Sequence, residues 1–330
     1  MLNRLWQTVR IGYFWAVKNN TRMLSPIIKF KNVWLTFSGL LVAASVVLFF
    51  LWGLKLSIDF TGGSFIQVGF QPAVIDKAQV ADVLEKLNYG PARVQPGGQD
   101  EYIIRMRFLS GEEYQTVADT LRELAQRQEG GQLIEKRFEI VGPAIGSELQ
   151  KKAWGAIVAV LIAIVAYIAW AFRGVSKPVP SWKYGIAALV VLFHDIAIPV
   201  GIFSVLGRYF NIEIDILFVT ALLAILGYSV DNTIVVFDRM REQLIRARGD
   251  KSFTEIVDAS VIQTLGRSLN NSLTLFLVLL AIYLYGGISI SYFILTMLFG
   301  VVIGTYTSIF VAGPLLLQWH LWTQRKRTSQ

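Results

Sequence analysis

Two carboxylic acids lie inside long apolar stretches of the sequence, where ionisable side chains are rare. Asp195 lies within residues 185–206, and Asp231 lies within residues 216–237. A carboxylate at mid-membrane costs about 2.5–3.5 kcal/mol on insertion scales, so such groups usually face a polar interior and mark an ion or proton path. A carboxyl group that is neutral when buried and ionised when wetted can carry a proton. The alternative for both acids is a static hydrogen bond or salt bridge between helices.

The residues around Asp231 favour this acid over Asp195. Residues 227–233 read Gly-Tyr-Ser-Val-Asp-Asn-Thr, so small and polar groups surround the carboxylate. Gly227 and Asp231 are four residues apart and share one face of a helix. Such a face can approach a neighbouring helix closely and offer it hydrogen bonds. We therefore expect Asp231, with Asn232 beside it, to be the main ion-carrying acid.

A basic residue opens the next apolar run. Arg267 precedes a polar stripe in residues 270–274, and a cation there could tune the pKa of a nearby acid. The alternative is that Arg267 reaches to the membrane surface with its long side chain. In the last run, Gly300, Gly304 and nearby small residues are spaced four apart, which is typical of tight helix packing.

The composition excludes several other kinds of chemistry. The chain has no cysteine and only two histidines, His194 and His320, so thiolate chemistry and a histidine-rich metal site are excluded. No Ser–His or Cys–His set is present in the apolar runs, and we expect no enzyme activity. We expect no cofactor beyond a transported proton or sodium ion. The basic residues flank apolar runs instead of forming one face, so nucleic acid is not an expected partner.

The distribution of charge predicts a membrane protein with six spans. Charged residues make up 16% of the chain, and none occurs between Ser268 and Gln324. A bilayer is crossed by about 20 apolar residues. The predicted runs cover residues 33–53, 153–172, 185–206 and 216–237, followed by two more that break at residues 285–287.

Lysine and arginine in the connecting segments predict the orientation. Residues 1–32 hold six basic and no acidic residues, and the segments 173–184, 238–268 and 319–330 are also basic. Basic flanking segments stay in the cytoplasm, so both termini are predicted inside and residues 54–152 outside. The predicted parts are a cytoplasmic segment with an amphipathic helix (1–32), a first span (33–53), an extracytoplasmic domain (54–152), five further spans (153–318) with a cytoplasmic loop (238–268), and a basic tail (319–330).

Residues 54–152 show the pattern of a small α+β domain. Strand-like stretches at 64–70, 92–95, 101–108 and 134–141 alternate with helix-like stretches at 75–87 and 112–128. The resulting order βαββαβ is that of a ferredoxin-like fold. Without histidine or cysteine, this domain is expected to bind or to act as a lever.

Several motifs together resemble a known family. In chain order they are Asp59-Phe60-Thr61-Gly62-Gly63, residues 141–143 and 146–149, His194-Asp195, Gly227-Tyr228-Ser229, residues 233–239 and residues 304–308. Their order and spacing resemble the SecF family, the smaller membrane subunit of the bacterial SecD–SecF protein-export complex. The similarity runs over nearly the whole chain from Val33 onward.

The resemblance implies an architecture and partners. SecF-like proteins belong to the resistance-nodulation-division superfamily, and their six helices pair with six from a SecD-like subunit. The implied partners are SecD, the SecYEG channel, the SecA motor, unfolded preprotein and membrane lipid. The implied activity is the use of the proton motive force, or of sodium, to assist preprotein export at a late step across the cytoplasmic membrane.

The resemblance also implies roles for particular residues. In the family, an acid in the fourth span and an arginine at the start of the fifth are implicated in proton conduction. These two positions correspond to the Asp231-Asn232 pair and to Arg267 in this sequence. Family members usually read Asn-Asp at this pair, whereas this sequence reads Asp-Asn. One residue turns a side chain by about 100° around a helix, so the acid is expected to point elsewhere unless a local bulge restores its direction.

Three other interpretations are open. A small-molecule or lipid exporter of the same superfamily usually carries both six-helix halves in one longer chain. A scaffold subunit would stabilise SecD without an ion path of its own, and the titration of Asp231 would distinguish it. An intramembrane enzyme would need a catalytic set that the apolar runs lack.

Overall fold

The computed structural model describes residues 24–71, 75–98, 101–127, 130–172, 179–247, 250–287 and 290–328. They form two compact units. One contains Leu54–Ala159 with Phe203–Val219, and the other contains Val160–Ile202 and Thr220–Gln330 with the chain before Leu54. The predicted amphipathic helix in residues 1–32 lies outside the described residues.

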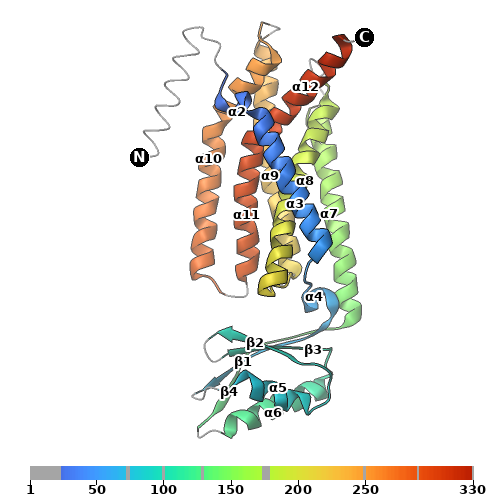
Figure 1. Ribbon diagram of the computed structural model, residues 1–330, viewed down its shortest axis with the longest axis vertical. Helices are drawn as coiled ribbons and strands as arrows, with labels where there is room; N and C mark the ends of the chain where they lie inside the picture. The colour runs from blue at the N-terminus through green and yellow to red at the C-terminus, as the bar shows by residue number, and fades with distance from the viewer. Residues whose placement is uncertain are drawn as a thin grey trace. The chain divides into compact units, whose positions relative to one another are not determined.

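Six helices in the described part of the chain are long and apolar enough to cross a membrane, as the sequence predicts (Figure 1). A short helix, α2 (Pro26–Lys29), precedes the first of them. The six are α3 (Lys31–Trp52), α7 (Pro143–Ala171), α8 (Ser181–Phe210), α9 (Ile216–Ala247), α10 (Phe253–Tyr285), and a last one made of α11 (Ser291–Thr307), a π-helical segment (Ser308–Ala312) and α12 (Gly313–Thr328).

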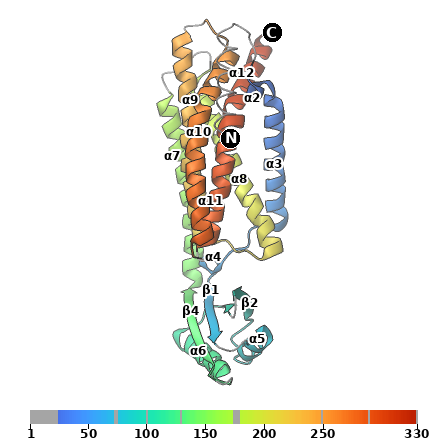
Figure 2. The same cartoon turned by 90° about the vertical axis from the view of Figure 1, so that its left-hand side faces the viewer.

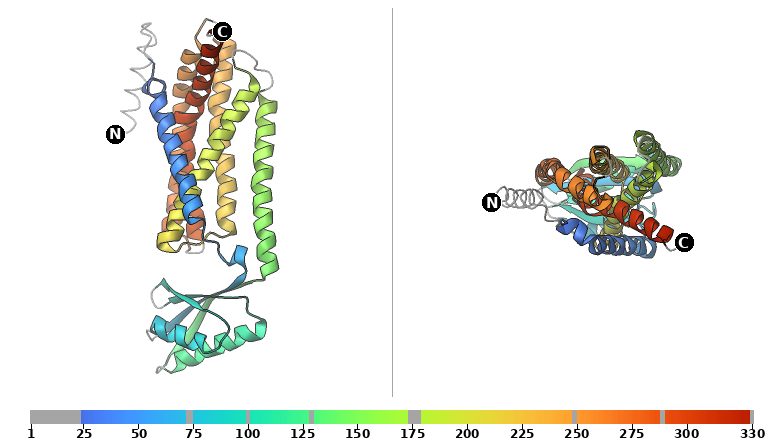
Figure 3. Two further views of the ribbon diagram at one scale, coloured as in Figure 1. Left: turned by 45° about the vertical axis from the view of Figure 1, so that its right-hand side comes forward. Right: turned by 90° about the horizontal axis from the view of Figure 1, so that it is seen from above.

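The helices extend well past the apolar runs. The ribbon of α7 is unbroken from Pro143, inside the predicted 54–152 domain (Figure 3). The expectation of a loop at 238–268 is wrong, because α9 continues to Ala247 and α10 begins at Phe253. Glu242 pairs with Arg239 and with Arg246 on the polar end of α9. Charged pairs three or four residues apart support helix beyond the apolar run.

The helices differ in how much of their surface other residues cover. The apolar stretches of α8, α9 and the 291–326 helix are buried over half or more of their residues, whereas those of α3, α7 and α10 are buried over less than a fifth. The first three therefore form the centre of the helical unit, and the others present apolar faces outward.

The other unit contains a four-stranded antiparallel sheet with two helices on one face (Figure 2). Its elements are α4 (Ile58–Thr61), β1 (Gly63–Gln71), α5 (Lys77–Glu85), β2 (Arg93–Gly98), β3 (Glu101–Met106), α6 (Gly111–Gln126) and β4 (Gln132–Val141). The strand order β2-β3-β1-β4 confirms the predicted ferredoxin-like βαββαβ fold. Alternate residues of β1, such as Ile66, Val68 and Phe70, pack against Val80 of α5 and Leu121 of α6.

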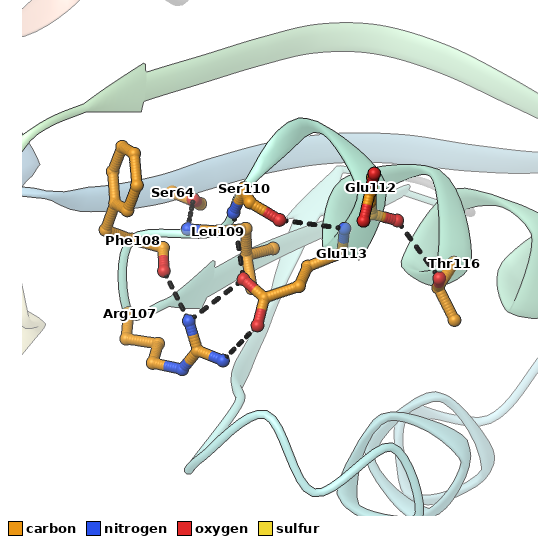
Figure 4. Close-up of polar contacts among 8 residues, drawn as sticks. All are labelled: Ser64, Arg107, Phe108, Leu109, Ser110, Glu112, Glu113 and Thr116. Atoms are coloured by element: carbon orange, nitrogen blue, oxygen red, sulfur yellow. Dashed lines mark hydrogen bonds and ion pairs between the residues drawn. The ribbon is translucent and has the colours of Figure 1, made fainter.

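A network of hydrogen bonds fixes the start of α6 (Figure 4). The Ser110 hydroxyl accepts from the Glu113 N–H at 3.2 Å, and the Glu113 carboxylate accepts from the Ser110 N–H at 2.8 Å. This reciprocal pair is a capping box, which satisfies two N–H groups at the helix start. Arg107 donates to Glu113 at 3.0 Å, and Ser64 of β1 accepts from the Leu109 N–H at 3.1 Å. The helix is thus attached to the strand before it and to the centre of the sheet.

The Glu113 cap predicts acid sensitivity at this helix. The Arg107 guanidinium and the Ser110 N–H lower the pKa of Glu113 from 4.5 to about 2. A lowered pKa stabilises the fold above pH 4.5, and this contribution is lost as the pH falls towards 2. We expect the protection factors of the amides in the first turn of α6, which are exchange rates corrected for the intrinsic rate at each pH, to fall over this interval in the parent chain. In Glu113→Gln these protection factors should already be low at neutral pH and should change less with acid. Equal pH profiles would contradict this account.

A second prediction concerns the close approach of α9 and α11. A Cβ on Gly300 would overlap the Ile225 side chain, whereas a Cβ on Gly155 of α7 would meet no atom within 4 Å. Overpacking costs about 1–3 kcal/mol, so Gly300→Ala should lower the Tm of the detergent-purified chain and Gly155→Ala should not. Adding Ile225→Ala should recover part of the loss. Equal Tm values for the two glycine variants would show that this contact is not tight.

Candidate functional site

Asp195 lies at the centre of a polar cluster within the helical unit. Its side chain, on α8, is fully buried. The carboxylate accepts hydrogen bonds from the Ser229 hydroxyl of α9 and, at 3.0 Å, from the Thr307 hydroxyl of α11. The His194 Nδ1 lies 3.1 Å from its other oxygen. Three central helices therefore converge on one carboxylate, as expected of an acid that must be solvated inside a membrane protein.

The helix that supplies Thr307 changes its winding at that residue. The α-helical hydrogen bonds of α11 end at Thr307, and residues Ser308–Ala312 are π-helical. Such single turns insert an extra residue and are frequent at functional sites. Thr307 also lies within hydrogen-bond distance of its own-helix carbonyl at Gly304, 3.1 Å away. Its hydroxyl can therefore turn from Asp195 to the backbone without being left unpaired.

A second polar cluster links α9, α10 and α11. Tyr228 donates to Ser272 at 2.5 Å, and its hydroxyl oxygen lies 3.3 Å from Thr305. Thr305 and Ser272 are themselves 2.6 Å apart. Since Tyr228 and Ser229 are adjacent, one turn of α9 contributes to both clusters. The cluster contains only hydroxyls, so it can rearrange its hydrogen bonds without moving a charge.

Six further side-chain polar atoms are buried without a hydrogen-bond partner among the described residues. They are Trp34 Nε1, Tyr184 Oη, His194 Nε2, Asn232 Nδ2, Thr233 Oγ1 and Ser268 Oγ. Buried polar groups are nearly always paired, so unpaired ones invite a functional explanation. Together with Asp195, they add groups that can donate or accept hydrogen bonds to the interior of the helical unit.

The structure separates the two acids that the sequence singled out. Asn232 is buried, at 2% exposure, whereas Asp231 is exposed on α9. The swapped Asp-Asn order therefore turns the acid outward, and no bulge in α9 reverses this. The preference for Asp231 over Asp195 rested on sequence context, which carries no information about which side of the helix is covered.

Arg267 is also exposed, on α10. The hydrogen bonds Tyr228–Ser272 and Arg239–Gln263 make α9 and α10 antiparallel neighbours. In this register Asp231 lies close to the level of Asn270 and within about one helical turn of Arg267. The two predicted ion-relay charges, Asp231 and Arg267, thus lie at similar depth on the outer surface of the chain.

The motif at 59–63 belongs to the unit that contains the sheet, and its residues have a structural role. Phe60 is buried and Thr61 donates to the Ser57 carbonyl at 3.0 Å. Gly62 has φ +72° and a Cβ there would lie 2.9 Å from Pro143, while Gly63 has φ +139° and a Cβ there would lie 2.8 Å from the Met106 carbonyl. Both positions exclude a side chain, by conformation and by space.

Asp59 of the same motif binds the start of α9. Its carboxylate accepts from the Ile216 N–H at 3.0 Å, and Asp215 accepts from the Phe218 N–H at 2.9 Å. Burial raises the pKa of Asp215, and the negative charge of Asp59 raises it further. Two carboxylates thus satisfy N–H groups that a helix start leaves free.

Sequence reasoning missed part of the site. Thr305 and Thr307 stood only in a family motif, and the small residues around them were assigned to packing alone. His194 stood only as one of the two histidines and as part of the His194-Asp195 motif. The one usable signal was their position: hydroxyl residues inside an apolar run tend to hydrogen-bond to a neighbouring helix.

Comparisons with known proteins agree with this architecture. The family description "Protein export membrane protein SecD/SecF, C-terminal" matches residues 121–322, and "SecD/SecF GG Motif" matches residues 47–74. The protein translocase subunit SecF of Thermobaculum terrenum is 40% identical over 89% of this chain and 93% of its own length. That of Desulfurispirillum indicum is 36% identical over 89% of this chain and 91% of its own.

A solved structure is also similar. The crystal structure of SecDF, a translocon-associated membrane protein from Thermus thermophilus, has a TM-score of 0.74 and 31% identity over 90% of this chain. The match covers 39% of the SecDF chain, so this chain corresponds to about two fifths of that protein. The six helices and the ferredoxin-like sheet are consistent with one half of a resistance-nodulation-division architecture. This chain belongs to the SecD/SecF family of protein export membrane proteins.

Proposed function

We propose that this chain is the SecF-type subunit of a SecD–SecF complex and assists protein translocation by coupling ion flow to late-stage export. Its relatives are SecF translocase subunits over nearly their whole length, which supports a role in protein translocation and does not favour a small-molecule exporter. The observation that supports the ion coupling is the buried carboxylate of Asp195, held by hydroxyls from two other helices.

The coupling uses the hydrogen bonds of Asp195. An ionised carboxylate only accepts, so the Ser229 and Thr307 hydroxyls both point toward it. A proton on the oxygen that both hydroxyls face turns that oxygen into a donor, and one of the hydroxyls must then turn away from it. Thr307 can turn to the Gly304 carbonyl. Protonation thereby changes the relative stability of two packings of α8, α9 and α11, which is a population shift driven by ion binding.

The small, polar and charged residues exposed on α9 and α10 fit a SecD-like partner. Asp231 and Gly227 on α9, and Arg267, Asn270 and Thr274 on α10, are exposed in this chain. Lipid does not satisfy such groups, so a second set of helices with polar side chains is the partner we infer for this face. The chain's match to two fifths of SecDF leaves room for that second half. The Asp231–Arg267 face would then extend the ion path between the two subunits.

The remaining features of the proposal follow the charge pattern and the family. The chain is a multi-pass membrane protein. We place it in the bacterial cytoplasmic membrane, with both termini in the cytoplasm and the ferredoxin-like fold outside, since the basic segments flank the spans on one side. SecYEG, SecA, unfolded preprotein and lipid are the further proposed partners. The transported ion, proton or sodium, is the only proposed small-molecule requirement, and no enzyme activity is proposed.

The two acids distinguish two versions of the relay. We expect Asp195→Asn to abolish gradient-dependent export from inverted vesicles that contain the SecD partner, because Asn cannot exchange a proton. Complex recovery should be unchanged, since Asn keeps the size and an acceptor oxygen. Asp231→Asn should reduce export less, because its side chain is outside the central cluster.

The controls separate these outcomes from loss of structure. Asp82 is an exposed acid on α5 that pairs with Lys86. The variant Asp82→Asn should export like the parent. If Asp231→Asn is inactive and Asp195→Asn is active, the path lies on the face between subunits. If both variants export normally, the chain is a scaffold. Repeating the assay with a protonophore and then with a sodium ionophore identifies the ion.

A further inference from the structure

A short segment after α3 is joined to the turn between α8 and α9. Leu56 and Ile214 form a parallel β-bridge. Ser57 N–H donates to the Ile214 carbonyl at 2.9 Å, and Ile214 N–H donates to the Lys55 carbonyl at 2.8 Å. We call residues 55–59 and 213–216 the clamp. Both segments belong to the compact unit that contains the sheet.

An ion triad fixes the clamp to the sheet. The Glu213 carboxylate is 9% exposed and lies 3.4 Å from Lys55 and 2.9 Å from Arg105. Arg105 is in β3, at the middle of the sheet. Removing one member of such a largely buried group leaves an uncompensated charge, so the triad resists opening. Glu213 therefore holds the turn between α8 and α9 to the sheet, so that the two move together.

Asp59 attaches the clamp to the first turn of α9. Its carboxylate accepts from the N–H of Ile216, the first residue of that helix, at 3.0 Å. The first N–H groups of a helix have no partner inside the helix, and their positive end attracts a carboxylate. Asp59 lies between Ser57, which is bridged to Ile214, and Gly62, which packs on Pro143 of α7. Its position along the chain is thus fixed on both sides.

The helix that starts at the clamp is the one that carries the polar clusters. α9 is continuous from Ile216 to Ala247 and contains Tyr228, Ser229 and Asn232. Ser229 follows Ile216 by about 20 Å along the helix axis, at 1.5 Å per residue. A continuous helix over this distance moves nearly as a rigid body, so a shift near Ser229 reaches Ile216.

We propose that the clamp transmits movements of α9 to the ferredoxin-like fold, with Asp59 as the positioning residue that makes the connection rigid. The inference rests on the proposed function, because it assigns a route for the ion-driven motion. The clamp remains closed throughout the cycle and moves as one body. The positive φ angles of Gly62 and Gly63 are then part of this connection, since the turn that they make brings Asp59 to the start of α9.

The absence of native cysteine allows a direct test. Asp59→Ala removes the carboxylate that holds α9, and Leu56→Cys with Ile214→Cys replaces the β-bridge pair by residues that an oxidant can join. We expect Asp59→Ala to reduce gradient-dependent export about tenfold, the factor that corresponds to losing one charge-assisted hydrogen bond. Forming the disulfide in the same chain should restore export, and reducing it should remove the rescue.

Three further measurements complete the test. The double-cysteine chain without Asp59→Ala should export equally well oxidised and reduced, because a clamp that stays closed is unaffected by a bond across it. Asp82→Ala is the matched control for loss of an acid. Recovery of the complex with the SecD partner, measured for every variant, shows whether it has folded.

Each outcome bears on the proposal. Normal export by Asp59→Ala, failure of the disulfide to rescue it, or loss of export when the clamp is cross-linked in the parent background would each overturn the proposal. If the parent chain itself does not stimulate gradient-dependent export, the proposed function fails instead. The parent reading in the same vesicles therefore separates the two failures.

Discussion

The helical unit is organised around a single requirement, the solvation of a carboxylate that water does not reach. Asp195 is fully buried, and its oxygens must find donors among the helices that surround it. Ser229 and Thr307 supply these donors from α9 and α11. This requirement explains why the central helices are α8, α9 and α11. It also explains why small residues such as Gly300 line their contacts, since hydroxyl donors on short side chains reach only between closely packed helices.

The same arrangement makes the site responsive. Thr307, one of the two donors to Asp195, has an alternative acceptor within its own helix, and the neighbouring Tyr228–Ser272–Thr305 cluster contains only hydroxyls. A change in the protonation state of one carboxyl can therefore reorganise several hydrogen bonds without leaving a buried group unpaired. The π-helical turn after Thr307 adds a local departure from regular helix at the same place. Regular, fully paired helices would give no second packing to select.

Backbone geometry explains the residues of the motif at 59–63, which lies within the match to the SecD/SecF GG motif. Gly62 and Gly63 adopt positive φ and pack against Pro143 and the Met106 carbonyl, where a side chain does not fit. Asp59 then lies where the first N–H of α9 needs an acceptor. The motif is therefore a joint between segments far apart in the sequence, and its residues form no catalytic set.

The sequence by itself determined the elements. Long uncharged runs predicted six membrane helices, and periodicity predicted the βαββαβ order, because hydrophobic spacing directly reflects which surfaces are buried. It also placed Asp195, Asp231, Asn232 and Arg267 within or beside apolar runs, as the residues of interest. The spans predicted for α7, α9 and α10 were too short. A helix continues past its apolar run when charged pairs support it.

Only the tertiary structure decided which of these residues act together. Asp195 and Thr307 are far apart in sequence and meet because α8 and α11 pack against each other. Asp231 and Asn232 are adjacent, yet helical geometry buries one and exposes the other. The clamp between Asp59 and Ile216 is likewise invisible in sequence. A sequence pattern reports which face of one helix is apolar, whereas hydrogen-bond partners depend on how several helices are rotated against one another.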